Sequence, residues 1–169
     1  MRGHNTNSRA AAAAQSAGRF QDRPAMVFLW SALAALLMLA LAAPASAGGL
    51  IAADEAHRRS QAGELLIVDV RSPREWRQTG LPKGAAAVTI HDPNGPEGFL
   101  AAMLSATGGD KARPIALICA SGVRSNRAHR FLEAKGFTSV VDVSEGMLGR
   151  RDAPGWLKRG LPTEPCKSC

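Results

Sequence analysis

Residues 115–125 have the sequence IALICASGVRS, the segment that most clearly indicates the fold of the chain. Its first four residues are apolar and predict a strand buried on both faces, as in a parallel sheet. Cys119 ends this strand, a tight loop with Gly122 follows, and residues 125–135 have helical spacing. This order places the sulfur over backbone N–H groups at a helix N-terminus, where an anion is favoured. We therefore predict that Cys119 is a nucleophile and not a buried structural cysteine.

Apolar runs and helical patterns alternate through the rest of the chain after residue 47. The patterns predict strands at residues 65–70, 85–90, 114–119 and 139–143, and helices at 52–61, 73–78, 96–106 and 125–135. Strands and helices that alternate at this spacing predict an α/β fold with a central, mostly parallel sheet and helices on both faces. Ligands bind such sheets at the carboxyl ends of the strands, where Cys119 lies.

Residues 1–47 are predicted to be a signal peptide. An apolar stretch without charges runs from Ala25 to Ala43, and Pro44 is followed by Ala45-Ser46-Ala47, small residues that suit a signal peptidase. Cleavage after Ala47 would release a periplasmic or secreted protein. The stretch has nearly the length that spans a bilayer, so an uncleaved membrane anchor is the alternative.

Charge and composition limit the classes of partner. The formal net charge is +7, and part of it comes from arginines within residues 1–47. No basic cluster is interleaved with aromatic residues, so nucleic acid is not an expected partner. The remaining positive balance suits a small anionic substrate. No cofactor and no metal ion are expected, and a membrane is a partner only if the leader is uncleaved.

Several motifs resemble the rhodanese-like sulfurtransferase domain, in the same order and at the same spacing. They are Asp69-Val70-Arg71, Glu75-Trp76, GLPKGA at residues 80–85, the loop CASGVRS at residues 119–125, and Gly136-Phe137. The resemblance covers about residues 50–165, essentially the whole predicted domain at residues 48–165, and it implies a three-layer rhodanese-like fold.

One stretch departs from the family pattern. Members often carry a Gly-Gly pair followed closely by tryptophan, whereas this chain has Glu145-Gly146, and Trp156 follows only after an insertion at residues 147–155. We expect the insertion to change the rim of the site and not its chemistry.

The resemblance implies that a sulfane sulfur is transferred through a persulfide of Cys119. The thiolate would attack the outer sulfur of a small anionic donor such as thiosulfate, and cyanide, a thiol or an acceptor protein would take the sulfur. The expected substrate-binding groups are the backbone N–H groups of the loop, and Arg124 adds positive charge toward the donor or braces the loop. These loop residues are Ala120, Ser121, Gly122, Val123 and Arg124.

Other side chains near the loop are expected to have structural roles. Asp69 should hold the loop or Arg71 in place and not perform proton chemistry. Glu75 is expected on the surface of a helix and Trp76 in the core. His91 follows a predicted strand and could face the site, although a surface position is favoured.

Loop length separates this interpretation from a phosphatase. Phosphatases of the cell-division-cycle type resemble the same fold, but they place five residues between cysteine and arginine. Only the four residues 120–123 lie between Cys119 and Arg124. The narrower ring suits sulfur better than phosphate, so phosphatase and arsenate reductase activities are minor alternatives.

The C-terminal tail, residues 166–169, contains the pair Cys166 and Cys169 as a candidate redox site. No helix follows it, unlike a redox CxxC motif, and a zinc site would need two further ligands. In an oxidising compartment the pair either forms a disulfide or acts as a flexible dithiol arm that discharges Cys119.

Three classes of function remain open from the sequence. The first is an exported sulfurtransferase, which the intact loop with both Cys119 and Arg124 favours. The second is a sulfur-carrier or docking module with the same fold. The third is a thiol–disulfide oxidoreductase that works through the tail cysteines.

Overall fold

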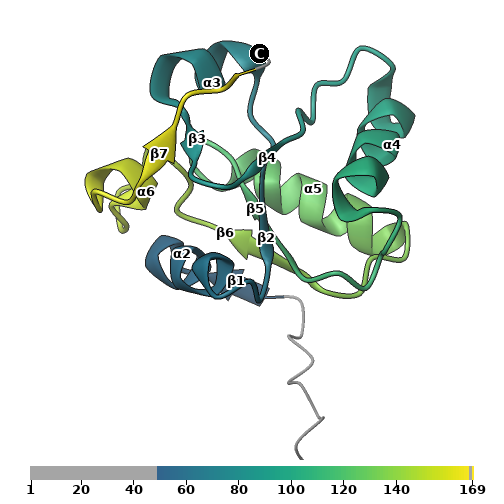
Figure 1. Cartoon of the computed structure of the whole chain (residues 1–169), viewed down its shortest axis with the longest axis horizontal. Coiled ribbons are helices and arrows are strands. Elements are labelled where there is room, and N and C mark those ends of the chain that lie inside the picture. Colours follow the sequence, from purple (N-terminus) through teal and green to yellow (C-terminus); the bar gives the residue numbers. More distant parts are fainter. Residues whose placement is uncertain (1–48, 168) are drawn as a thin grey trace, which may run out of the picture. The chain divides into compact units, whose positions relative to one another are not determined.

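The computed structural model describes residues 49–167 and residue 169 (Figure 1). The predicted signal peptide lies outside these residues. In the part of the chain that is described, no helix combines the length and apolar character needed to cross a membrane.

Five short parallel strands form the central sheet, in the order β1-β6-β5-β2-β4. They are β1 (Gly49–Ile51), β6 (Val140–Val143), β5 (Ile115–Ile118), β2 (Leu66–Asp69) and β4 (Ala86–Ala87). All four residues of β5 are buried, because the strand has neighbours on both edges and helices on both faces. The strand predicted at residues 85–90 is too long. Val88 and Ile90 still donate hydrogen bonds to the carbonyls of Asp69 and Val70, but β2 has ended there and the ladder stops.

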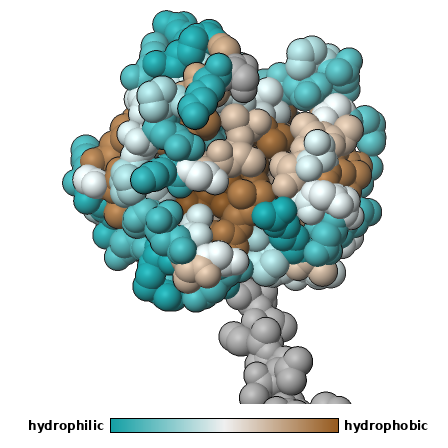
Figure 2. Space-filling model, in the orientation of Figure 1, coloured by the Kyte–Doolittle hydropathy of each residue, from teal (hydrophilic) through white to brown (hydrophobic). Residues whose placement is uncertain are grey.

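Helices cover both faces of the sheet, which confirms the predicted three-layer α/β fold (Figure 1). On one face α4 (Gly95–Thr107) and α5 (Val123–Ala134) bury Phe99, Met103 and Leu132. On the other face α2 (Ala53–Gln61) and α6 (Gly155–Lys158) bury Ala56 and Trp156. Figure 2 shows an apolar area near the middle of the face in view, surrounded by hydrophilic residues.

α3 (Pro73–Thr79) begins shortly after the carboxyl end of β2. A capping box starts it: the Ser72 hydroxyl accepts from the Glu75 N–H, and the Glu75 carboxylate accepts from the Ser72 N–H. Pro73 occupies the first helical turn, where its missing N–H costs nothing. The local sequence therefore places α3 at the end of the sheet where Cys119 lies.

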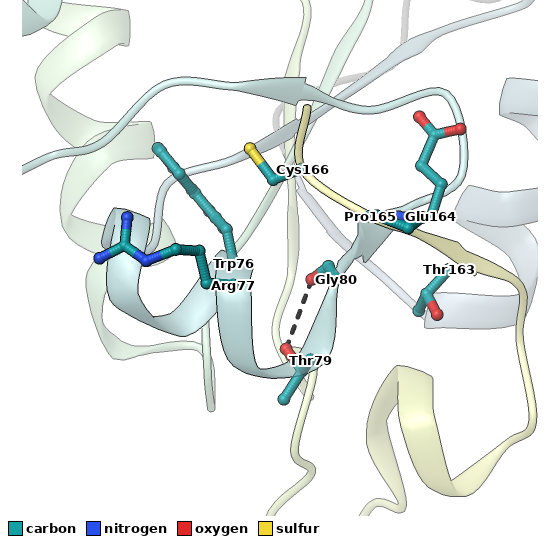
Figure 3. Close-up of a pocket in the computed structure, with 8 residues that line it drawn as sticks. All are labelled: Trp76, Arg77, Thr79, Gly80, Thr163, Glu164, Pro165 and Cys166. Atoms are coloured by element: carbon teal, nitrogen blue, oxygen red, sulfur yellow. Dashed lines mark hydrogen bonds between the residues drawn. The ribbon is translucent and has the colours of Figure 1, made fainter. Parts of the chain in front are cut away.

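The C-terminal tail packs against α3. β7 (Thr163–Glu164) pairs antiparallel with β3 (Leu81–Pro82), and the Arg77 side chain donates to the Cys169 carbonyl oxygen. Cys166 and Cys169 form a disulfide. Figure 3 shows Cys166 beside Trp76 in a pocket of about 540 Å³. The structure thus shows the tail cysteines as a disulfide, with the tail docked against α3.

Candidate active site

The Cys119 side chain lies under the loop at the carboxyl end of β5 and is 1 % exposed. The Gly122 N–H donates to its Sγ atom at 3.2 Å, and the Ser125 hydroxyl donates at 3.4 Å. Both donors belong to the start of α5, so the sulfur faces a helix N-terminus. The arrangement can stabilise negative charge on the sulfur or on an atom attached to it. Ser125 is a site residue that the sequence analysis did not single out.

The loop requires glycine at position 122. Gly122 has φ +91°, and a Cβ atom there would come within 2.1 Å of the Ser144 carbonyl oxygen. This close approach brings the loop against the residue that follows β6. The Gly122 N–H is thereby fixed in place facing Cys119.

Residues 146–148 support the other side of the loop through backbone contacts. The N–H groups of Met147 and Leu148 donate to the carbonyls of Cys119 and Ala120, at 2.8 and 2.9 Å. Gly146 has φ +66°, and a Cβ atom there would lie 2.5 Å from the Ala120 carbonyl. The Trp156 N–H returns to the Gly146 carbonyl at 2.9 Å, so the insertion leaves this support intact.

Glu145, which replaces a glycine of the family pattern, is buried and joins two helices. Its carboxylate accepts from the N–H groups of Ala53 and Gly155, at 2.7 and 2.9 Å, and from the Arg159 side chain at 3.0 Å. Burial alone would raise the pKa of Glu145, but these three donors together leave its pKa below the usual value. The carboxylate thus caps the starts of α2 and α6 behind the loop.

Arg124 makes a two-pronged ion pair with Glu75, with N–O distances of 2.6 and 2.8 Å. Arg124 lowers the pKa of Glu75 to about 2. The pKa of Arg124 is raised, mostly by Glu75 and to a smaller extent by Cys119 and Asp69. The guanidinium therefore braces the loop while its charge remains close to the sulfur. Glu75 is half-buried on the surface of α3, and its pairing with Arg124 was not predicted because 49 positions separate the two residues in the chain.

Asp69 and Arg71 form a buried ion pair at the end of β2, with a shortest N–O distance of 2.7 Å. The Arg71 guanidinium also donates to the Thr79 hydroxyl and the Gly80 carbonyl, each at 2.7 Å. These hydrogen bonds hold the end of α3 against the sheet, so Asp69 and Arg71 stabilise the structure around the site. His91 is exposed.

The tail cysteines are placed against α3 and not in the loop. Cys166 lines a pocket together with Trp76 and Thr79. Within the described residues, no group of three His, Cys, Asp or Glu side chains is suited to bind a metal ion.

Comparison with known proteins assigns the chain to a family. Residues 52–151 match the family described as "Rhodanese-like domain". A sulfurtransferase of Allochromatium vinosum is 27% identical over 105 residues, which cover 62% of this chain and 83% of that protein. An uncharacterised protein of Rickettsia prowazekii, RP600, is 30% identical over 101 residues, 57% of this chain and 80% of that protein.

A solved structure with the same fold is the Alr3790 protein from Anabaena sp.. It is 25% identical, with a TM-score of 0.54, and the match covers 69% of this chain and 82% of that chain.

Proposed function

Because the chain belongs to the rhodanese-like family, we propose that it is a sulfurtransferase working through a persulfide on Cys119. The donor is thiosulfate or a similar sulfane compound, and the acceptor is a thiophilic molecule. The observation that carries this proposal is the pair of donors, Gly122 N–H and Ser125 hydroxyl, directed at the Cys119 sulfur. The relationship to a sulfurtransferase of Allochromatium vinosum supports it.

The first step is attack by the Cys119 thiolate on the outer sulfur of thiosulfate. A new S–S bond forms as the sulfur–sulfur bond of the donor breaks, and sulfite leaves with the electron pair. The loop N–H groups and the Ser125 hydroxyl then stabilise negative charge on the persulfide. In the second step an acceptor attacks the outer sulfur, and Cys119 leaves as a thiolate.

Arg124 contributes to this reaction in two ways. Its ion pair with Glu75 fixes the start of α5, and its charge attracts an anionic donor toward the loop. Both partners are only about one-quarter exposed, so water screens their pairing less than it screens a fully exposed pair.

Export is also part of the proposal. Its support is the small-residue sequence Ala45-Ser46-Ala47 after Pro44. The test is N-terminal sequencing of the protein recovered from outside the cytoplasm. A sequence beginning at Gly48 is expected, and a membrane-bound form that retains the leader would contradict it.

The function is tested by thiosulfate:cyanide transfer with two matched variants. Cys119→Ala should abolish transfer, whereas a double Cys166→Ser, Cys169→Ser variant should retain it. Undiminished transfer by Cys119→Ala would refute the assignment. Loss only in the tail variant would favour the thiol–disulfide oxidoreductase, and no transfer by the wild type would favour the docking module.

A further inference from the structure

A hollow of about 420 Å³ lies directly beside the Cys119 loop. Loop residues 121–123 form one wall, and the Gly122 in that wall is the residue whose N–H contacts the Cys119 sulfur. α5 and β6 form the other walls, and Arg150 from the insertion contributes to the rim. The site already described uses none of the charged side chains in this hollow.

The most informative side chain in the hollow is Asp142. It occupies β6 between Leu50 of β1 and Leu117 of β5, and it is 1 % exposed. Within residues 49–167, its Oδ1 atom has no hydrogen-bond donor. Burying a carboxylate oxygen without a hydrogen-bond donor costs free energy of folding. An acidic residue between two leucines of the sheet therefore indicates that a ligand supplies the missing donor.

The α5 side chains that face Asp142 do not fill this need. Burial raises the pKa of Asp142, and Ser125, His129, Asn126 and the charge of Arg150 oppose the rise only in part. The single proton of the Ser125 hydroxyl serves either the Cys119 sulfur or the Gly122 carbonyl, at 3.4 and 3.2 Å, and Oδ1 of Asp142 stays without a donor among the described residues. A ligand that brings an N–H donor would complete the site.

The rim of the hollow carries the opposite charge. Arg130 and Arg150 both line it and both are exposed. Arg150 pairs with Asp152 at 3.0 Å on the surface, and Arg130 has no ion-pair partner among the described side chains. Guanidinium groups bind carboxylates with two parallel hydrogen bonds. An acidic floor beneath a basic rim is complementary to a molecule that carries an ammonium group and a carboxylate group.

We propose that this hollow is the acceptor site and that it selects a small zwitterionic thiol. The ammonium group binds Asp142, and the carboxylate binds Arg130 and Arg150. This inference rests on the proposed sulfurtransferase function. The acceptor thiolate attacks the outer sulfur of the Cys119 persulfide, a new S–S bond forms, and the bond to Cys119 breaks with return of its electron pair to Cys119. The product is the acceptor persulfide, and the step needs no further oxidant or reductant.

The test compares four acceptors with the sulfur-loaded protein: L-cysteine, 3-mercaptopropionate without the ammonium group, cysteamine without the carboxylate, and cyanide. The wild type should prefer L-cysteine over each incomplete thiol by roughly ten- to a hundredfold in kcat/KM, the value of one charge-assisted contact. Asp142→Asn should remove the preference over 3-mercaptopropionate. Arg150→Ala should reduce the preference over cysteamine. Each preference is a ratio of two kcat/KM values measured on the same variant, so a smaller fraction of folded protein lowers both values equally and leaves the ratio unchanged.

Arg127→Ala is the matched control, since Arg127 is also exposed on α5 but lines a different pocket. It should keep both preferences. Equal wild-type rates with all three thiols, or preferences that persist in both site variants, would overturn the proposal.

Binding of S-methyl-L-cysteine, measured by calorimetry, does not depend on sulfur transfer. Binding that is lost in Asp142→Asn is expected, and no binding to the wild type would overturn the site. If this ligand binds while cyanide takes no sulfur from thiosulfate-treated protein, the proposed function has failed and the zwitterion site has not.

Discussion

The two sides of the Cys119 loop are held in different ways. On the α3 side the contact is made by charged side chains, Arg124 with Glu75. On the opposite side residues 146–148 contact the loop through backbone hydrogen bonds and the close approach of Gly146. The first side depends on charge and therefore on pH. The second depends on the absence of a side chain at one position.

The two sides should therefore tolerate different substitutions. Backbone hydrogen bonds survive most substitutions, so the exposed Leu148 can vary, whereas Gly146 cannot and Met147 is constrained by its buried side chain. The charged side can be weakened stepwise, by removing the charge or by changing its geometry. The following predictions separate the two sides.

The largest effect is expected from Gly146→Ala on the backbone side. The new Cβ would lie 2.5 Å from the Ala120 carbonyl at a positive φ, so the loop must move. We expect the free energy of unfolding to fall on the order of 2–4 kcal/mol, with sulfur transfer largely lost. Urea unfolding measures the change. Gly63→Ala is the control, because Gly63 has φ +72° but nothing within 4 Å of the added atom. Equal losses in the two variants would contradict the role of close contact.

On the charged side, Arg124→Ala should lower kcat/KM for thiosulfate by roughly ten- to a hundredfold, as expected for loss of a charge-assisted contact. Arg124→Lys keeps the charge but not the two-pronged geometry, so it should restore part of the loss. If Arg124 mainly attracts the donor, most of the change should be a higher KM. If Arg124 mainly braces the loop, most of the change should be a lower kcat. Unchanged kinetics in a folded Arg124→Ala variant would remove Arg124 from the site.

A smaller effect is expected when the pH is lowered. The pKa of Glu75 is lowered from 4.5 to about 2 by Arg124. The stabilisation from the pair is therefore complete above about pH 4.5 and is lost as the pH falls toward 2, since the unfolded state takes up the proton first. Between these values the wild type should lose stability more steeply than Glu75→Gln, which retains the capping-box geometry. Urea midpoints at several pH values provide the comparison, and parallel curves would show that the pair adds nothing.

The smallest effect is expected in the tail. Cys166→Ser with Cys169→Ser should leave persulfide formation on Cys119 unchanged, because the disulfide packs against α3 and not against the loop. Discharge to a dithiol acceptor, assayed beside discharge to cyanide, tests the earlier alternative that the reduced pair takes the sulfur. A slower dithiol reaction with an unchanged cyanide reaction would favour that alternative.

The sequence predicted the elements whose burial leaves a clear pattern. β5 is a continuous apolar run, β2 and β6 are apolar apart from one aspartate each, and α3 carries its own capping signals. β1 and the β3–β7 pair were not predicted, because strands of two or three residues have no measurable periodicity.

The site was only partly predictable for a related reason. Cys119 and its loop are contiguous in the chain, so their geometry follows from a strand, a glycine and a helix. The partners of the loop come from distant segments: Glu75 contacts Arg124, and Gly146 contacts Ala120. Ser125 and Asp142 could be recognised only once burial showed where their polar atoms point.

Cys119 is expected to accept a sulfane sulfur, and intact mass spectrometry can detect the added atom. The purified domain is exposed to thiosulfate, measured whole and then digested. We predict that one sulfur atom is added, that it maps to the peptide containing Cys119, and that cyanide removes it. A wild-type mass that does not change, or an added sulfur found only on the peptide containing Cys166 and Cys169, would contradict a persulfide on Cys119.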